Sequence, residues 1–451
     1  MKKTLFICFM LGATFTSRAA NPMLKSAVKG DLKNDRIAAM ALASNGTYVT
    51  LLLADKTSLY AVDIEDTIAK EKVPNAITSI PDFVNSKLKP VAGGATLTVI
   101  DIEVNPISKS VYVLAQAAGV SYVFKVRNNG ANVTLIDLKN ITHSKLAWGG
   151  TFDVNDMTYG NGNLYASSGN STLDGSVATI PSPFTNGGAV TKKATTMFKS
   201  NWGGAYSTKA PLETMTYGLV KSKHRLMGVT TCAPGFSLDI TGLSGAGTTQ
   251  VTEDFNVQFG FSQKVVFQRH DGKDWLFDLH DSKLYRLGET LLDGSPVTAG
   301  QFNSDAVELR DFSGIPKAGI PADIFKEMTP GAGYQTIAYW DEFRLVVLES
   351  GGTLKMLQTA TKATPLSVDK VQPTTTLRVY PNPAQQTLNV NLSHTGETTL
   401  QVFSMDGRLV HTSKANSAAA TIDVSSFAKG QYVLKAWSEE GVAGEQIFSV
   451  Q

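Results

Sequence analysis

Apolar and polar residues alternate in short runs from residue 20 to about residue 360, and the runs come in groups of three. In one clear group, Ile100, Ile102 and Val104 form the first run, and further runs follow at residues 110–114 and 122–126. Alternation with period 2 is typical of half-buried strands, and polar or glycine-rich stretches between runs are typical of turns. Each group therefore predicts three antiparallel strands.

The group of three recurs roughly every 50 to 70 residues, a spacing typical of propeller blades. Comparable groups begin near residues 39, 155, 214, 264 and 335, which gives six in all. One blade cannot bury both its faces, so packing around an axis is expected, and an all-β propeller with six blades is the favoured fold. A β-sandwich or a solenoid of similar strands is the alternative.

Two stretches between the groups are harder to interpret. Residues 66–98 and 289–330 leave room for a seventh blade, and residues 321–327 predict a short helix with Asp323 near its start. The middle region also resembles uncharacterised secreted β-propeller proteins, mainly at residues 156–159 and 180–184. That resemblance implies a fold and no particular reaction.

The last 75 residues show the same alternation on a smaller scale. Leu388, Val390 and Leu392 alternate with polar residues, and so do Ile422 and Val424. Several short strands separated by turn signals predict a small antiparallel, immunoglobulin-like β-sandwich. An ordinary accessory domain of this class is one interpretation.

Four ordered motifs in this tail favour a more specific interpretation. They occupy residues 377–383, 399–410, 429–435 and 446–450. Together they resemble the type A C-terminal sorting domain of the type IX secretion system of Bacteroidetes. The motif residues are Tyr380, Pro381, Asn382, Pro383, Gly407, Gly430 and Tyr432. The resemblance implies recognition by the outer-membrane secretion machinery, frequent removal by a sortase-like cysteine peptidase, and attachment of the cargo to a surface lipopolysaccharide.

The N-terminus has the pattern of an export signal. Lys2 and Lys3 precede an apolar stretch at residues 4–15, and Ser17 and Ala19 fit the small positions of a cleavage site. Such a signal predicts passage through the periplasm to the outer surface or the medium, and no later stretch is apolar enough to predict a transmembrane segment. The expected organisation is a signal peptide at 1–19, the propeller at 20–358, a linker at 359–376 and the sorting domain at 377–451.

Charge and cysteine content disfavour nucleic-acid binding, a lipid anchor and a reactive thiol. Loss of residues 1–19 would remove three basic residues and no acidic one, so the net charge would change from +2 to −1. A near-neutral chain without a basic, aromatic-rich run does not favour nucleic-acid binding. Cys8 is too close to the N-terminus to favour a lipoprotein signal, and Cys232 is expected as a buried small residue rather than a reactive thiol.

The candidate chemistry depends on aligning the first strand of each blade, because innermost strands line the channel of a propeller. The alignment brings together Ala39, Asp101, Asp156, Thr214, Lys264 and Gln335. Asp101, Asp156 and Lys264 are thus candidate ligand-binding residues, and the two aspartates could hold a divalent cation such as Ca²⁺. Gluconolactonase-like six-bladed hydrolases hold a metal in this way, although the spacing here differs. The alternative is that both aspartates bind neighbouring backbone and close the ring.

Two further groups of residues are candidates. Trp202 and Tyr206 flank a glycine-rich stretch and could stack on a sugar or anchor a partner protein. Asp278 and His280 share one face of a strand, which is compatible with metal or acid–base chemistry or with polar turns.

The motifs of common hydrolases and nucleotide-binding proteins are absent. The sequence therefore favours a secreted or surface-anchored propeller that binds a glycan, a protein or a matrix ligand. A metal-dependent hydrolase or lyase at the channel mouth is the alternative, and a structural spacer is a third hypothesis.

Overall fold

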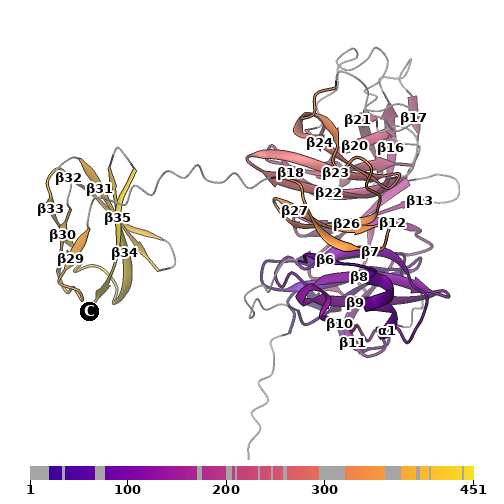
Figure 1. The fold of residues 1–451 in the computed structure, drawn as a ribbon, viewed down its shortest axis with the longest axis horizontal. Coiled ribbons are helices and arrows are strands. Elements are labelled where there is room, and N and C mark those ends of the chain that lie inside the picture. The colour runs from indigo at the N-terminus through magenta and orange to yellow at the C-terminus, as the bar shows by residue number, and fades with distance from the viewer. Residues whose placement is uncertain are drawn as a thin grey trace, which may run out of the picture. The chain divides into compact units, whose positions relative to one another are not determined.

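The chain divides into two compact units, residues 1–362 and residues 363–451, which are described separately. The first unit is drawn from indigo to orange and the second in light orange and yellow (Figure 1). The computed structural model describes residues 20–32, 36–66, 77–169, 175–199, 206–208, 211–231, 234–244, 247–256, 262–293, 320–360, 377–392, 397–405, 408–438 and 441–451. The predicted signal peptide at 1–19 and Cys232 lie outside these residues.

The first unit contains six blades, numbered here in chain order, and each begins with the strand nearest the axis. These inner strands are β3 (Ala39–Ser44), β7 (Thr98–Val104), β12 (Val154–Gly160), β18 (Leu212–Val220), β22 (Ser262–His270) and β26 (Tyr334–Asp341). Each inner strand contacts two others, and the contacts close a ring in the order β3, β12, β18, β22, β26, β7. Six closed blades confirm the predicted propeller within the described residues.

The remaining strands pair outward from each inner strand by antiparallel hydrogen bonding. Blade 1 continues with β4 (Val49–Ala54) and β5 (Ser58–Asp63), and blade 2 with β8 (Val111–Ala117), β9 (Val120–Arg127) and β10 (Asn132–Leu135). Blade 3 adds β13 (Asn163–Gly169), β14 (Gly175–Pro181) and β16 (Thr191–Lys199), and blade 4 adds β19 (Lys223–Thr230), β20 (Pro234–Asp239) and β21 (Thr248–Asn256). Blade 5 adds β23 (Lys273–His280), β24 (Lys283–Gly288) and β25 (Phe325–Glu327), and blade 6 adds β27 (Arg344–Glu349) and β28 (Leu354–Gln358).

Burial of apolar side chains explains why the ring closes. Six separate clusters of buried apolar residues are present, and each lies between two neighbouring blades. Between blades 1 and 2, for example, Leu51 and Leu53 pack with Tyr112 and Leu114. Because one face of every blade is buried by the next blade, no blade is stable alone and the ring is the cooperative unit.

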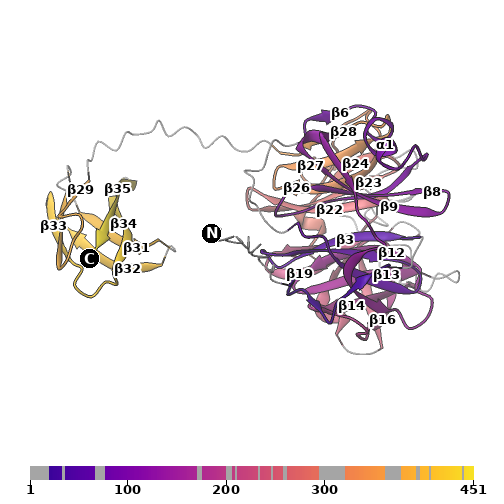
Figure 2. The same ribbon diagram turned by 90° about the horizontal axis from the view of Figure 1, so that it is seen from below.

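The order of blades around the ring differs from their order in the chain. Blade 2 lies between blades 6 and 1, so the chain passes blade 1 again on its way from blade 2 to blade 3. On that path β11 (Ile141–Ala147) pairs with β5 as an outer strand of blade 1, and β2 (Val28–Gly30) pairs with β11. Similarly, β6 (Ser79–Ile80) leads from blade 1 to blade 2 and pairs with β28 of blade 6, as Figure 2 shows. The crossing connections therefore complete the outer edges of other blades.

Two expectations about the connecting stretches need correction. Residues 79–80 and 325–327 do not belong to a seventh blade, because they provide outer strands of blades 6 and 5. The helix predicted at 321–327 is also wrong: a single turn ends at Ile324, and β25 follows. Phe325 is buried and its ring stacks on Tyr285 at 5.1 Å between centroids, so tertiary packing overrides the local helical signal.

The second unit is a β-sandwich with one core, as predicted. One sheet contains β29 (Arg378–Tyr380), β30 (Thr387–Asn391) and β33 (Ala419–Asp423). The other contains β31 (Thr398–Ser404), β32 (Leu409–Ala415), β34 (Gly430–Ser438) and β35 (Gly441–Val450). Leu388, Leu434 and Phe448 are among the buried residues that join the two sheets. Across the described part of the chain, no helix is both long and apolar enough to cross a membrane.

Candidate functional site

Five of the six inner strands contain a β-bulge near their start, and the bulge sets which side chains enter the channel. The register shifts just before Asp101, Asp156, Thr214, Lys264 and Thr336. The sequence alignment is therefore correct at the first four positions. It is wrong by one residue in blade 6, where Gln335 is the bulged residue and Thr336 takes the equivalent place.

Lys264 lies at the centre of a buried ion cluster that spans the channel. Its Nζ lies 2.8 and 3.0 Å from the two carboxylate oxygens of Asp101 and 2.8 Å from Oε1 of Glu103. Blade 6 lies between blades 5 and 2 in the ring, so these contacts reach past it across the channel. Burial alone would lower the pKa of the Lys264 ammonium, but Asp101, Glu103 and Asp156 hold that pKa well above its usual value.

The two aspartates make different contacts. Burial raises the pKa of Asp101 to about 7, although Lys264 opposes this shift. Burial also raises the pKa of Asp156, whose oxygens accept hydrogen bonds from the backbone N–H groups of Met157 and Met215, both at 2.8 Å. Met215 belongs to blade 4, so Asp156 ties blade 3 to its neighbour.

A polar opening of about 310 Å³ lies at the start of the inner strands, and we call it the polar mouth. Its lining includes Asn155, Asp156, Glu213, Thr214 and Lys264. Burial, and then the nearby charge of Asp278, raise the pKa of Glu213 to about 7.

Protein groups already occupy much of the polar mouth. Thr214 donates to Ser262 at 3.2 Å, and Ser262 donates to the buried carboxylate of Asp278 at 2.5 Å. Within the residues that the structure describes, no group of three or more His, Cys, Asp or Glu side chains could hold a metal ion. An ammonium instead neutralises Asp101, and a divalent cation at Asp101 and Asp156 stays a prediction.

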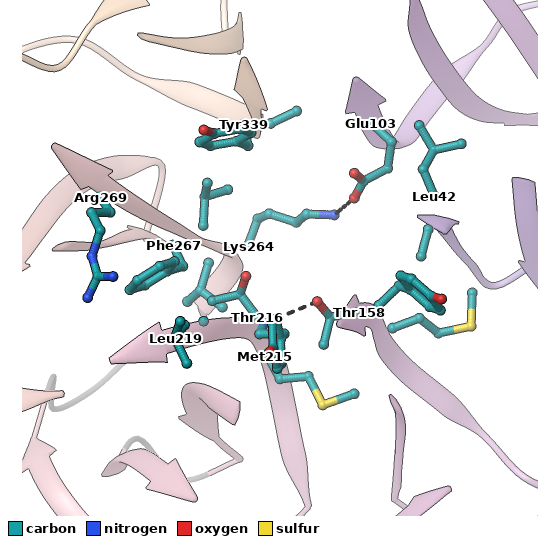
Figure 3. A pocket seen from close by; sticks show the side chains of 18 of the residues that line it. Leu42, Glu103, Thr158, Met215, Thr216, Leu219, Lys264, Phe267, Arg269 and Tyr339 are labelled. Atoms are coloured by element: carbon teal, nitrogen blue, oxygen red, sulfur yellow. Dashed lines mark hydrogen bonds and ion pairs between the residues drawn. The ribbon is translucent and has the colours of Figure 1, made fainter. Parts of the chain in front are cut away.

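A larger cavity of about 540 Å³ lies further along the channel, and we call it the aromatic cavity (Figure 3). Lys264 is the residue that lines both openings. Side chains in a strand alternate between faces, so the residues two positions after each channel residue form the next layer. Glu103, Thr158 and Thr216 contribute the polar groups of that layer, and Figure 3 shows the Lys264 amine reaching toward Glu103.

Aromatic residues follow at a fixed spacing. In four blades an aromatic residue stands three positions after the channel residue, and all four line the cavity: Tyr159, Tyr217, Phe267 and Tyr339. In blade 1, Leu42 takes the same place. The sequence search missed these residues, although the repeated Met-Thr-Tyr-Gly at residues 157–160 and 215–218 carried the signal.

Gly160 and Gly218 leave room for the aromatic rings of the next blade. A Cβ atom on Gly160 would lie 2.1 Å from the ring of Tyr217, and one on Gly218 would lie 2.7 Å from the ring of Phe267. Thr158 Oγ1 also accepts a hydrogen bond from the backbone N–H of Tyr217 at 3.1 Å. Since only glycine leaves this space, the aromatic wall depends on contacts between neighbouring blades.

The cavity carries little unbalanced charge. Lys264 is paired with Asp101 and Glu103, and the guanidinium of Arg269 donates to both carboxylate oxygens of Asp274 at 2.6 and 2.8 Å. Glu342 is exposed at the rim. The interior is therefore apolar and aromatic, with a polar floor and internally paired ions.

The other predicted ligand residues are not tested by this geometry. Trp202 lies outside the described residues. Tyr206 begins the short strand β17 (Tyr206–Thr208), whose side chains are likewise outside the description. Both stay predictions.

In the second unit, the predicted sorting residues lie close to the last strand. The Asn382 side chain accepts a hydrogen bond from the backbone N–H of Ser449 at 2.9 Å, and Ala384 pairs with Val450. The Tyr432 hydroxyl donates to the carbonyl of Ala428 at 2.7 Å, as in the tyrosine corner of immunoglobulin-like folds. Gly430 begins β34, Tyr380 is half exposed, and Gly407 lies outside the described residues.

A family model for the secretion system C-terminal sorting domain matches residues 378–449. These residues are a type IX secretion C-terminal sorting domain. The sorting domain directs the chain to the cell surface or the medium and implies contact with the type IX secretion machinery. The resemblance found in the four sequence motifs is confirmed, whereas processing by a sortase-like peptidase stays a prediction.

Solved structures with related folds include propeller proteins. Drosophila Semaphorin 1a, extracellular domains 1–2, is 8% identical with a TM-score of 0.35, and the match covers 74% of this chain and 88% of that one. PorZ, an essential surface component of the type IX secretion system of Porphyromonas gingivalis, is 12% identical with a TM-score of 0.20, covering 93% and 82%. The extracellular domain of BT4673 from B. thetaiotaomicron is 11% identical with a TM-score of 0.25, covering 93% and 68%. No curated protein matches the chain. The fold assignment rests on the blade geometry, not on these likenesses.

Proposed function

We propose that this exported propeller binds a neutral glycan in the aromatic cavity and performs no chemistry on it. The observation that carries the proposal is the repeated aromatic position, which places Tyr159, Tyr217, Phe267 and Tyr339 around one opening. Flat aromatic faces present apolar area at low entropic cost, and they suit the apolar faces of sugar rings.

The size and polarity of the cavity support the same ligand class. Pockets for small ligands commonly enclose about 300–1,000 Å³ and combine apolar walls with a few polar groups. The cavity volume of about 540 Å³ falls within this range, and its floor offers Thr158, Thr216 and the Lys264–Glu103 pair as hydrogen-bonding groups. Because the ions are paired internally, a charged ligand would gain little, so a neutral saccharide fits better than an acidic one.

The test is calorimetric titration of the exported chain with a panel of neutral hexasaccharides and uronic-acid hexasaccharides. We expect at least one neutral hexasaccharide to bind, and the Tyr339→Ala and Phe267→Ala variants to weaken that binding roughly tenfold, about 1.4 kcal/mol each. Ile100→Ala is the matched control, because Ile100 is a partly exposed residue of the polar mouth. Loss of affinity in the control but not in the aromatic variants would show that the saccharide binds in the polar mouth and would contradict the proposal.

A further inference from the structure

The outward face of the four-stranded sheet in the sorting domain has an unusual composition. Along these strands Val402, Leu434 and Phe448 point into the core and are fully buried. Because successive side chains alternate between faces, the neighbouring residues point away from the core. A sheet with one packed face normally carries polar residues on the other.

One outward row is apolar across the whole sheet. The strand register places Leu409 beside Phe403, Phe403 beside Val433, and Val433 beside Ile447. Each of the strands β32, β31, β34 and β35 contributes one residue. Leu409 and Ile447 are each 48% exposed, whereas Phe403 and Val433 are partly buried. We call these four residues the outer apolar row.

The adjacent row on the same face is polar, which makes the apolar row distinctive. Two residues further along the strands, Gln401 lies beside Lys435, and Lys435 lies beside Glu445. Lys435 and Glu445 form an ion pair at 3.2 Å. The apolar composition is therefore confined to one row, close to the β31–β32 turn, where Met405 is also 59% exposed.

The outer apolar row adjoins the segment that carries the sorting motif. Ile447 lies in β35, the edge strand of this sheet. The motif residue Asn382 donates from its side-chain amide to the carbonyl of Ile447 and accepts from the N–H of Ser449. The motif residue therefore hydrogen-bonds to the same strand that carries one end of the outer apolar row.

We propose that the outer apolar row is the surface by which the sorting domain docks on an outer-membrane protein of the type IX export machinery. The family match requires this domain to contact that machinery, and it assigns no surface to the contact. Two of the four side chains are about half exposed and two are partly buried, so the row exposes far less than the ~800 Å² per partner of a stable dimer. A small apolar surface of this kind suits brief capture by a protein with a complementary apolar face better than self-association.

The test uses the full chain expressed in a bacterium with a working type IX system. The Leu409→Ser/Ile447→Ser variant disrupts the row, and Gln401→Ser/Lys435→Ser is the matched control on the adjacent polar row. We expect at least a tenfold drop in extracellular protein, with accumulation in the periplasm, for the first variant and normal export for the control. Equal export of both variants would overturn the proposal.

Two measurements separate docking from misfolding and from self-association. A photo-crosslinking amino acid at position 409 should capture an outer-membrane protein of the export machinery in living cells, identified by mass spectrometry, whereas the same probe at position 401 should not. This arm keeps the row intact at its other three residues, so it holds even if the double variant is less stable. Crosslinking from position 409 only to a second copy of this chain would show a dimer interface instead.

Discussion

The two openings of the propeller channel share five inner strands, β3, β7, β12, β18 and β22, but differ in what their side chains are free to do. At the polar mouth, Asp156 accepts two backbone hydrogen bonds and Asp101 is paired with Lys264. At the aromatic cavity, Phe267 and Tyr339 line open space. The carboxylates that the sequence singled out thus already have partners within the protein, whereas the aromatic cavity lies two or three residues further along each strand.

This difference shows which inner-strand positions carry paired charges and which line open space. Bulges at the strand starts turn charged residues inward, where they must pair because burying an isolated charge is costly. Lys264 reaches across the channel to Asp101 and lines both openings. Polar residues therefore link the blades, and the aromatic residues Phe267 and Tyr339 line open space.

The largest effect is expected on removal of the central cation. Lys264→Met leaves Asp101 buried without its ammonium, and breaking a buried pair from one side costs about 3–5 kcal/mol. We expect a loss of that size in the free energy of unfolding, measured by urea denaturation of the chain.

A double variant distinguishes ion pairing from packing. Lys264→Met/Asp101→Leu removes the ammonium and its bidentate carboxylate and keeps apolar volume, so part of the lost stability should return, the rest reflecting Glu103 left without its cation. If Lys264→Met unfolds at the same urea concentration as the wild type, the ion cluster does not stabilise the closed ring of blades.

The second effect concerns the link between blades 3 and 4. Asp156→Ala leaves the backbone N–H groups of Met157 and Met215 without their acceptor, at about 1–3 kcal/mol each. We expect a total loss of about 2–4 kcal/mol. Asp153→Ala is the control, because the partly exposed Asp153 side chain forms an ion pair with Lys56 at the surface, and it should cost less than about 1 kcal/mol.

The sequence predicted the parts of the fold that depend on local pattern. The period-2 runs gave the inner strands, and the alignment placed Asp101, Asp156 and Lys264 together correctly. The ring order could not be predicted, because β11 and β6 pair with strands that lie far away in the chain. Their pairing is decided by which blade edge remains open, which no local pattern records.

The aromatic cavity was missed for a different reason. Tyr159 and Tyr217 lie in the second halves of their strands and look like ordinary strand residues in the sequence. Their common role appears only when the bulges fix the register, since a shift of one residue moves every side chain to the other face. The glycine that follows each tyrosine was the available clue, because each leaves room for the ring of the next blade.

The third effect tests that packing. Gly160→Ala places a methyl group against the ring of Tyr217, which must move. Overpacking costs about 1–3 kcal/mol, and saccharide binding should weaken because the aromatic wall shifts. Thermal unfolding and calorimetric titration of one preparation measure both effects. Gly30→Ala adds a methyl group in open space within a strand and should leave affinity unchanged, so equal effects in both variants would contradict the seating of Tyr217.

The smallest effect is a pH dependence that belongs to the polar mouth alone. Burial raises the pKa of Glu213 to about 7, and the charge of Asp278 adds to the shift. Between its ordinary value near 4.5 and about 7, the folded chain keeps a proton that the unfolded chain releases, so stability falls as the pH rises through that window. Glu213→Gln removes this loss, and its unfolding temperature should drop less between pH 5 and pH 8 than that of the wild type. Asp101 titrates in both proteins, so the difference between them isolates Glu213.

Saccharide affinity should change equally with pH in the two proteins, because Glu213 does not line the aromatic cavity. If the variant alters the pH profile of binding as well, the two openings are coupled through Lys264 and are not independent.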